Sequence, residues 1–322
     1  MRAIVVHEQG GPEKLVLEEV PDPTPGPGEV LVDIEAAGLN FIDVYQRNGL
    51  YRLDLPFIPG QEGAGIVSAI GPGVSGIRVG DRVGWVSVLG GYAERVVLPA
   101  EKTIPIPDAI GSDVAAAVLL QGMTAHYLAT DTFPLREGHK CLIHAGAGGV
   151  GLLLTQIARI KGAHIVTTVG SREKADLSRE AGADQVVVYT ETGLKEAIEE
   201  TLGPRPLHVV FDGVGAATFD DGLDLLARRG MMVTFGNASG PVPPVAPLTL
   251  MQKGSLFLTR PTLAHYLRTR EEMLSRAEDL FGWIEAGVLE VRIGAEYPLT
   301  DVAKAHEALE SRQTTGKVLI RP

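Results

Sequence analysis

The chain of 322 residues carries 29 Lys and Arg against 40 Asp and Glu, a net charge of −11, and a single cysteine, Cys141. The length predicts two domains, and the acidic balance argues against a nucleic-acid partner, since affinity for phosphate backbones depends on clustered Lys and Arg. One cysteine excludes internal disulfides and cysteine-cluster zinc sites. Without the apolar core of a signal peptide or an apolar stretch that could cross a bilayer, we expect a cytoplasmic protein with no membrane partner.

Short β-rich runs occupy the first third of the chain. Segments rich in Pro and Gly, such as residues 21–28 and 71–73, separate these runs, because fixed or permissive backbones interrupt strands. The pattern is typical of a small barrel-like β domain. The predicted strands span residues 15–20, 30–35, 63–70, 81–86 and 92–98.

From about Asp113 the pattern changes, and segments of helical period alternate with short apolar strands. This alternation predicts an α/β fold with a doubly wound parallel sheet. Two amphipathic stretches, 263–286 and 302–311, then precede a last strand at 317–320, and we expect all three to return to the first domain. The predicted strands of the sheet include residues 141–144, 165–168, 185–188 and 209–211.

A glycine-rich loop follows the strand at 141–144. Gly146, Gly148 and Gly151 fit the pattern G-x-G-x-x-G, directly before a helix predicted over residues 152–161. Glycine lets the backbone turn sharply and approach a pyrophosphate, whose charge is stabilised by free N–H groups and by the helix dipole. In this context the loop predicts a dinucleotide site; the alternative is a turn that only packs helix on strand.

The end of the next strand indicates which dinucleotide is bound. An NAD enzyme usually carries an acidic residue there, whereas this chain has Gly170 and Ser171, followed by Arg172 and Lys174. Two cations suit a 2′-phosphate, which a carboxylate would repel, so NADPH is favoured over NADH. Two alternatives stay open: Glu173 could bind a ribose, and the two cations could be solvated surface charge.

Seven segments of the chain, among them Gly38-Leu39-Asn40-Phe41-Ile42-Asp43-Val44-Tyr45, resemble the zeta-crystallin-like quinone oxidoreductases of the medium-chain dehydrogenase/reductase superfamily. The likeness spans essentially the whole chain. It implies a GroES-like β-rich catalytic domain built from residues 1–122 and 262–322. It also implies a Rossmann NADPH-binding domain over residues 123–261, with the active site in the cleft between the domains. The other segments are residues 49–51, 59–65, 147–151, 229–240, 254–257 and 259–261.

The resemblance also implies chemistry without a metal. In the zinc-dependent branch of the superfamily, the position aligned with Asn40 is a metal-binding cysteine and the position aligned with Gln61 is a histidine. An amide is a poor Zn²⁺ ligand beside thiolate and imidazole, and the segment 85–91 is short and has no cysteine for a structural zinc lobe. Without a Lewis acid, the hydride acceptor should already be electron-poor, as a quinone or an activated enone is.

Individual site residues follow from the same resemblance. Tyr45 is the candidate donor to the developing oxyanion, and Asn40 can add an amide N–H, although both could simply shape the cleft. Asp43 and Glu62 are interpreted as carboxylates that hold loops. The resemblance places Thr124 at the nicotinamide ribose or carboxamide. Together with the glycine motif and the basic segment, the expected cofactor residues are Asn40, Thr124, Gly146, Gly148, Gly149, Val150, Gly151, Gly170, Ser171, Arg172, Lys174, Tyr189, Phe235, Gly236, Asn237, Thr259 and Arg260.

The leading hypothesis is therefore a zinc-independent NADPH:quinone oxidoreductase that forms a homodimer, as the family resemblance suggests. Two alternatives stay open. One is an NADPH-dependent enone or alkenal reductase on the same scaffold, and the other is an NADPH-binding protein with little turnover. Cys141 lies within an apolar strand and is interpreted as a core residue rather than a nucleophile.

Overall fold

The computed structural model describes all 322 residues, which form two compact units. Unit 1 comprises Met1–Met123, Arg268–Gly287 and Val291–Pro322. Unit 2 comprises Thr124–Leu267 and Val288–Glu290. Both ends of the chain therefore contribute to unit 1, whereas unit 2 is almost continuous in sequence. None of the helices combines the length and the apolar character needed to span a bilayer.

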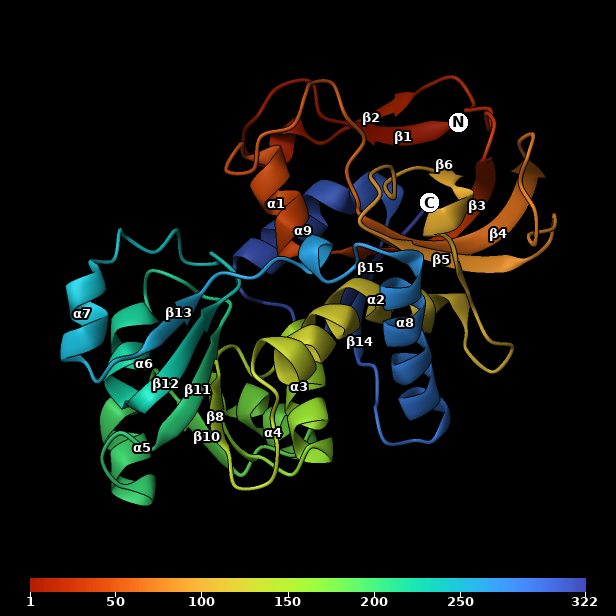
Figure 1. Cartoon of the computed structure of the whole chain (residues 1–322). Coiled ribbons are helices and arrows are strands. Elements are labelled where there is room, and N and C mark those ends of the chain that lie inside the picture. Colours follow the sequence, from red (N-terminus) through yellow and green to blue (C-terminus); the bar gives the residue numbers. More distant parts are fainter. The chain divides into compact units, whose positions relative to one another are not determined.

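A seven-stranded sheet forms the centre of unit 1 (Figure 1). The strands run in the order β14-β15-β3-β4-β5-β7, and β6 pairs with β3. All paired strands are antiparallel except β14 and β15, which are parallel. Strand β3 pairs with β4, β6 and β15 along its length and so ties the sheet together. The strands are β3 (Glu29–Leu39), β4 (Glu62–Ile70), β5 (Arg82–Val86), β6 (Arg95–Pro99), β7 (Ile104–Pro105), β14 (Ile293–Pro298) and β15 (Lys317–Arg321).

The helices of unit 1 and a small hairpin pack around this sheet. Its core contains the fully buried rings of Trp85 and Tyr92. Helix α8 begins at Arg270, so the predicted start at residue 263 is wrong: Thr269 and Glu272 form a capping box that fixes the first turn. The remaining elements are β1 (Arg2–Val5), β2 (Val16–Glu19), α1 (Phe41–Arg47), α8 (Arg270–Glu285) and α9 (Val302–Glu310), and α2 (Ser112–Tyr127) begins in unit 1.

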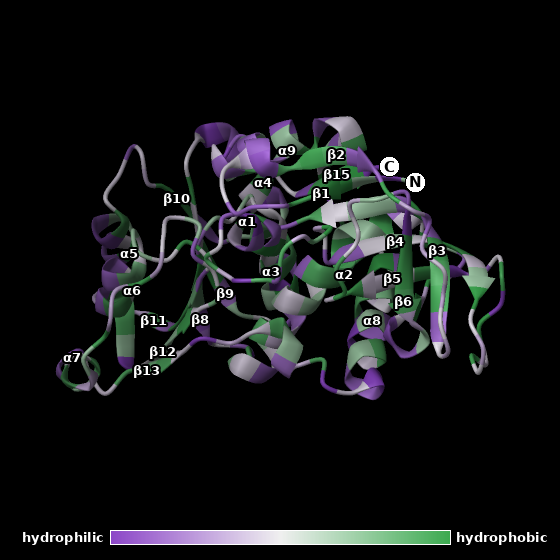
Figure 2. Cartoon of the chain, turned by 90° about the horizontal axis from the view of Figure 1, so that it is seen from above, coloured by the Kyte–Doolittle hydropathy of each residue, from purple (hydrophilic) through white to green (hydrophobic).

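Six parallel strands form the sheet of unit 2, in the order β10-β9-β8-β11-β12-β13. Helices α3 and α4 lie on one side of this sheet, and α5 and α6 lie on the other (Figure 1 and Figure 2). The predicted doubly wound parallel sheet is thus confirmed. The strands are β8 (Lys140–Ile143), β9 (His164–Val169), β10 (Gln185–Val188), β11 (Leu207–Asp212), β12 (Leu226–Thr234) and β13 (Phe257–Thr259). The helices are α3 (Gly149–Ile160), α4 (Arg172–Glu180), α5 (Leu194–Leu202), α6 (Phe219–Leu225) and α7 (Pro247–Gln252).

The central strands of unit 2 are apolar because helices cover both faces of the sheet. Leu142, Val166 and Val210 are fully buried, in one cluster with Leu223 of α6. Cys141 is also fully buried, and burial raises the pKa of its thiol to about 12, as expected of a core residue. In an open sheet of this strand order, ligands bind at the carboxyl ends of the strands where the order reverses, here between β8 and β11.

Candidate functional site

Most of the predicted cofactor residues lie at the carboxyl edge of the unit 2 sheet. The glycine motif follows β8, the basic segment follows β9, and Tyr189 follows β10. The segment 235–237 follows β12, and Thr259 and Arg260 stand at the end of β13. Because parallel strands end at one edge, residues far apart in the sequence are brought to the same side of the sheet.

The glycine loop, residues 146–151, leaves no room for side chains at two of its glycines. A Cβ at Gly151 would lie 2.2 Å from the carbonyl oxygen of Ala145, and a Cβ at Gly146 would lie 2.6 Å from Cβ of Thr167. The helix begins at Gly149, earlier than the predicted start at residue 152, because Leu152 N–H donates to Gly148 O at 2.9 Å. The first N–H groups of α3 have no acceptor within the helix, and its first turn has no acidic residue. The loop therefore fits an anionic pyrophosphate.

A second group of polar residues surrounds the start of α4. We call Gly170, Ser171, Arg172, Lys174 and Tyr189 the rim. Ser171 is the N-cap of α4, and its Oγ accepts a hydrogen bond from Lys174 N at 3.4 Å. A Cβ at Gly170 would lie only 2.8 Å from the Tyr189 hydroxyl, so glycine lets this phenol approach the end of β9. The Tyr189 side chain is exposed, with room to face a ligand.

Arg172 forms a two-pronged ion pair with Glu191, a residue that the sequence reasoning missed. Arg172 Nε lies 2.9 Å from Oε1 of Glu191, and Nη2 lies 3.0 Å from Oε2. The Glu191 carboxylate raises the pKa of Arg172, and the guanidinium lowers the pKa of Glu191. The only signal in the sequence is that Glu191 follows the strand-end Tyr189 by two residues. The structure therefore places an acidic side chain against the basic rim.

Arg260 links the ends of β12 and β13. Its Nη1 donates to the carbonyl oxygen of Thr234 at 2.9 Å, and its Nη2 lies 3.2 Å from the side-chain amide of Asn237. Phe235 N–H donates to the carbonyl oxygen of Asp212 at 2.8 Å, which holds the segment after β12 against the end of β11. Phe235, Asn237 and Arg260, which were expected to hold the nicotinamide end of the cofactor, therefore lie close together at this edge of the sheet.

The loop after β11 is also ordered by a residue that the sequence reasoning missed. Asp212 is fully buried, and its Oδ1 accepts hydrogen bonds from Val214 N at 2.7 Å and Gly215 N at 3.0 Å. The Thr218 hydroxyl also donates to both Asp212 oxygens. The sequence Asp-Gly-Val-Gly directly after a strand could have indicated this turn.

Asn40 lies in unit 1 beside three other polar residues, of which Glu62 and Lys317 are buried and Gln121 is half-buried. We call Asn40, Glu62, Gln121 and Lys317 the buried amide network. Oδ1 of Asn40 accepts from Lys317 Nζ at 2.9 Å and from Gln121 Nε2 at 3.1 Å. Nδ2 of Asn40 donates to Glu62 Oε2 at 2.9 Å and to Gly38 O at 3.1 Å. Both amide hydrogens and both acceptor positions of Asn40 are therefore used inside unit 1.

Charge in this network is balanced by the ion pair between Lys317 and Glu62, which are 1% and 0% exposed. Burial lowers the pKa of Lys317, and the neighbouring Glu62 carboxylate opposes that shift. Lys317 and Gln121 were not predicted from the sequence as members of this network. A lysine at the first position of an otherwise apolar strand could have indicated Lys317, whereas no pattern in the sequence indicated Gln121. Glu62 Oε1 also accepts from Leu120 N at 2.6 Å. The predicted bond to a backbone N–H is therefore present, but this N–H belongs to helix α2 and not to a loop.

Asp43 caps the helix that carries Tyr45. Its Oδ2 accepts from Asn40 N at 2.9 Å and from the Tyr92 hydroxyl at 2.8 Å. Burial raises the pKa of Asp43 to about 7, against the lowering effect of these two hydrogen bonds. Asp43 therefore holds the connection from β3 to α1, as predicted.

Tyr45 lies in the same helix, α1, where its ring contacts Tyr51 with centroids 5.3 Å apart. Its side chain is almost fully buried. Thr124 is buried in the last turn of α2, within unit 2. No group of three or more His, Cys, Asp or Glu side chains is placed to hold a metal ion. The amide of Asn40, at the position of a zinc ligand in metal-dependent relatives, is occupied by the hydrogen bonds of the network.

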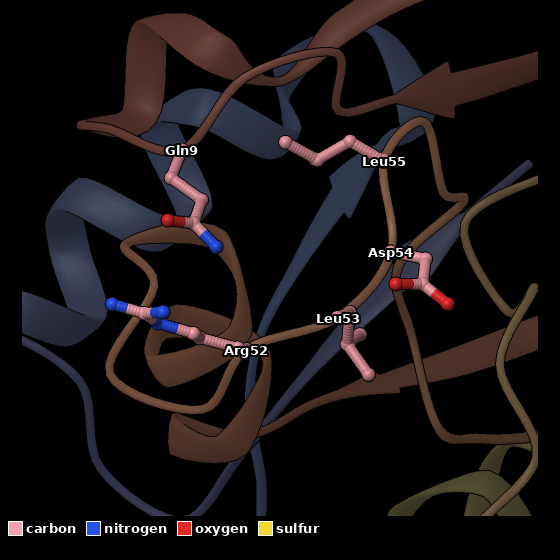
Figure 3. A pocket seen from close by; sticks show the side chains of 5 residues that line it. All are labelled: Gln9, Arg52, Leu53, Asp54 and Leu55. Carbon is pink, nitrogen blue, oxygen red and sulfur yellow. The ribbon is translucent and has the colours of Figure 1, made fainter.

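Unit 1 also has an open pocket of about 440 Å³, lined by Gln9, Arg52, Leu53, Asp54 and Leu55 (Figure 3). Figure 3 shows the Arg52 and Asp54 side chains pointing to opposite sides. None of the predicted site residues lines this pocket, so it is distinct from the groups described above.

Comparisons with known proteins agree with this architecture. Residues 26–108 match the family described as alcohol dehydrogenase GroES-like domain, and residues 149–282 match the family described as zinc-binding dehydrogenase. The quinone oxidoreductase of Salmonella typhimurium is 45% identical to this chain over 99% of both proteins. A 2-haloacrylate reductase from a Burkholderia species is 38% identical over 99% of this chain and 98% of the reductase. The crystal structure of Escherichia coli quinone oxidoreductase complexed with NADPH has a TM-score of 0.97 and 44% identity, with full coverage of both chains.

Proposed function

Because this chain belongs to the quinone oxidoreductases of the medium-chain dehydrogenase/reductase superfamily, we propose that it transfers a hydride from NADPH to a quinone. The same comparisons confirm the predicted fold class, a GroES-like β-rich domain with a Rossmann domain. The observation that carries the proposal is the carboxyl edge of the unit 2 sheet. There the glycine loop fits a pyrophosphate. Gly170 and Ser171 stand where an NAD enzyme usually has an acidic residue, and Lys174 follows in the first turn of the next helix.

NADPH, when bound, supplies the hydride, and this chain's residues hold and orient it. We assign the pyrophosphate to the N–H groups of Gly149, Val150 and Gly151, and the 2′-phosphate to the rim. The nicotinamide end is assigned to Thr124 together with residues 235–237, Thr259 and Arg260. Orientation of this kind can account for much of the rate of a hydride transfer, since it replaces a bimolecular encounter by a fixed geometry.

On the acceptor side we assign Tyr45 as the donor to the oxygen that becomes negative during reduction. A phenol can donate a hydrogen bond to this oxygen without changing its own charge. We assign Asn40 an indirect role: the network holds its side chain in place, and its backbone N–H donates to Asp43 in the first turn of the helix that carries Tyr45. We infer that the acceptor is electron-poor, because the Asn40 amide is a poor metal ligand and the Glu62 carboxylate is paired with Lys317, which leaves neither for a metal that could polarise a simple ketone.

The test is oxidation of NADPH and of NADH, followed by the loss of nicotinamide absorbance, with benzoquinone or phenanthrenequinone as acceptor. We expect fast NADPH oxidation that depends on the quinone. Tyr45→Phe should lower turnover by roughly tenfold or more, the range for loss of a transition-state donor, while leaving NADPH affinity unchanged. Tight NADPH binding without turnover on any acceptor would overturn the proposal in favour of a binding protein.

A second candidate function, reduction of an activated alkene, is favoured by the relative named as a 2-haloacrylate reductase. A quinone and an alkene conjugated to a carboxylate or carbonyl are both electron-poor hydride acceptors. Turnover on 2-chloroacrylate and on an enone, compared with benzoquinone under the same conditions, separates the two. A higher kcat/KM for the alkene would replace the first proposal by the second.

We also propose that the protein is a homodimer in the cytoplasm. Strand β13 is the edge of the unit 2 sheet, and Phe257 on it and Met251 on the preceding helix are more than half exposed. An open strand edge beside exposed apolar side chains is suited to pairing with a second copy. Phe257→Glu should shift the mass measured by light scattering from dimer to monomer. Fractionation of cells tests the location, and recovery in the membrane fraction would contradict it.

A further inference from the structure

Glu191 lies beside the proposed 2′-phosphate site, although an acidic side chain does not favour the binding of an anionic phosphate. Its position is fixed by neighbours: Tyr189 N donates to Val169 O at 3.1 Å, and the Thr190 hydroxyl donates to Gly170 O at 3.2 Å. The segment 189–191 therefore lies along the rim. Its carboxylate engages Nε and Nη2 of Arg172, one of the edges with which a guanidinium binds an oxyanion.

Glu191 weakens the binding of a 2′-phosphate whether Arg172 stays in the ion pair or leaves it. If Arg172 stays with Glu191, the pair is neutral and the rim loses the net charge of one cation. If Arg172 leaves to contact the phosphate, the Glu191 carboxylate remains unpaired next to an anion of the same sign. Both cases weaken the binding of a 2′-phosphate, and neither affects a ribose that carries only hydroxyl groups.

We propose that Glu191 is a specificity-determining residue that limits the preference of this protein for NADPH over NADH. This inference rests on the proposed function, because it takes the rim to be the 2′-phosphate site. Glu191 acts as the repulsive element of a site that Ser171, Lys174 and Tyr189 make attractive. The chain therefore accepts NADH more readily than the composition of the rim alone predicts.

The test is titration calorimetry of the full chain with 2′,5′-ADP and with 5′-AMP, which differ by the 2′-phosphate alone. Glu191→Gln should tighten 2′,5′-ADP binding by roughly threefold, the size expected of one exposed charge a few ångströms from a phosphate in salt solution. The affinity for 5′-AMP should not change. The gain should grow at low ionic strength, since screening is then weaker.

Glu180→Gln is the matched control. Glu180 is exposed and is the last residue of the same helix, about 12 Å along the axis from Arg172, so this variant removes an equal charge away from the rim. It should change 2′,5′-ADP binding by less than about twofold, because solvent and salt screen a charge at greater distance. In an Arg172→Ala background, Glu191→Gln should still tighten 2′,5′-ADP binding, since the carboxylate then repels the phosphate directly.

Two outcomes would overturn the proposal. Unchanged or weaker 2′,5′-ADP binding by Glu191→Gln would mean that Glu191 holds Arg172 in place for the phosphate. Equal tightening of 2′,5′-ADP and 5′-AMP would mean a general charge effect. The test measures the binding of 2′,5′-ADP and of 5′-AMP and not turnover, so it remains valid even if the protein does not reduce quinones. A wild-type protein that binds the two nucleotides equally would instead refute the 2′-phosphate site itself.

Discussion

Two ion pairs of the same kind, one in each unit, differ in almost every other respect. Lys317 and Glu62 are fully buried, and both form hydrogen bonds with the side-chain amide of Asn40. Arg172 and Glu191 are 83% and 43% exposed and contact each other at the surface. A buried pair is costly to separate, whereas an exposed pair contributes little to stability and remains free to respond to a ligand. Burial thus decides whether such a pair serves the fold or the choice of cofactor.

The buried pair also fixes the direction of its neighbours' hydrogen bonds. Lys317 can only donate and the Glu62 carboxylate can only accept, so the Asn40 amide has one satisfied orientation. No such constraint acts on the rim, where water can replace any partner. Variants of the buried pair should therefore change stability, and variants of the rim should change the binding of nucleotides.

Lys317→Met should lower the free energy of unfolding by about 3–5 kcal/mol, because it leaves the Glu62 carboxylate buried without its cation. Both tryptophans, Trp85 and Trp283, belong to unit 1, so tryptophan fluorescence during urea unfolding reports this unit. Adding Glu62→Gln to the Lys317→Met variant should recover part of the loss.

Arg321→Met is the control for this prediction. Arg321 lies on the same strand as Lys317 but pairs with Glu296 at the surface, with exposures of 36% and 45%. Its loss should cost less than about 1 kcal/mol, as for other exposed pairs. If Lys317→Met and Arg321→Met had the same free energy of unfolding, the buried pair would contribute no more to stability than the exposed pair does.

Asp43→Asn should remove a pH dependence of stability. The folded-state pKa of Asp43, about 7, lies above the ordinary value of 3.8, so the folded protein binds the proton more tightly than the unfolded chain does. This contribution is complete below the unfolded pKa and is lost as the pH rises through the folded pKa. Urea unfolding of the wild type between about pH 4 and pH 8 should therefore show this component falling with pH. In Asp43→Asn that component should be absent; an unchanged profile would contradict the assignment.

Lys174→Gln should weaken 2′,5′-ADP binding by roughly tenfold, since it removes a charged donor from the rim. The affinity for 5′-AMP and the urea midpoint should stay the same, in contrast to the variants of the buried network. Calorimetry with both nucleotides measures the effect. Equal weakening of the two nucleotides would place Lys174 away from the 2′-phosphate.

Tyr189→Phe should have the smallest effect, a loss of roughly two- to fivefold in 2′,5′-ADP affinity, because it removes one neutral donor and keeps the ring. Gly170→Ala is the companion variant, since its Cβ would displace the Tyr189 hydroxyl that lies 2.8 Å away. The two variants should therefore have similar effects on binding. A strong effect of Gly170→Ala in a Tyr189→Phe background would point to distortion of the loop instead.

The sequence predicted local features of the molecule better than features that depend on distant pairing. The glycine loop and the strands around it were predictable, because strand, loop and helix are adjacent in the chain. The buried amide network was not, because Lys317 and Glu62 are 255 residues apart and meet only through the pairing of β15, β3 and β4. Glu191, only 19 residues from Arg172, escaped prediction because an exposed acidic residue after a strand carries no distinctive pattern.

Helix boundaries show the same limit. The start of α8 depends on the capping box of Thr269 and Glu272, which overrides the longer amphipathic pattern that begins at residue 263. In α3 the glycines themselves form the first turn, although glycine has a low helix propensity. Hydrophobic periodicity located these two helices, but the capping box of α8 and the backbone hydrogen bond from Leu152 to Gly148 in α3 decided where they begin.

The pairing of the last strand with β3 has a consequence for synthesis. Unit 2 is nearly complete once Leu267 has been made, but unit 1 lacks α8, α9, β14 and β15 at that moment. On the ribosome, which extends a chain from its N-terminus, Asn40 and Glu62 emerge early and meet their cation only after Lys317 has been added. A chain released before Lys317 would contain every proposed contact to the cofactor and still lack the cation that completes the buried network of unit 1.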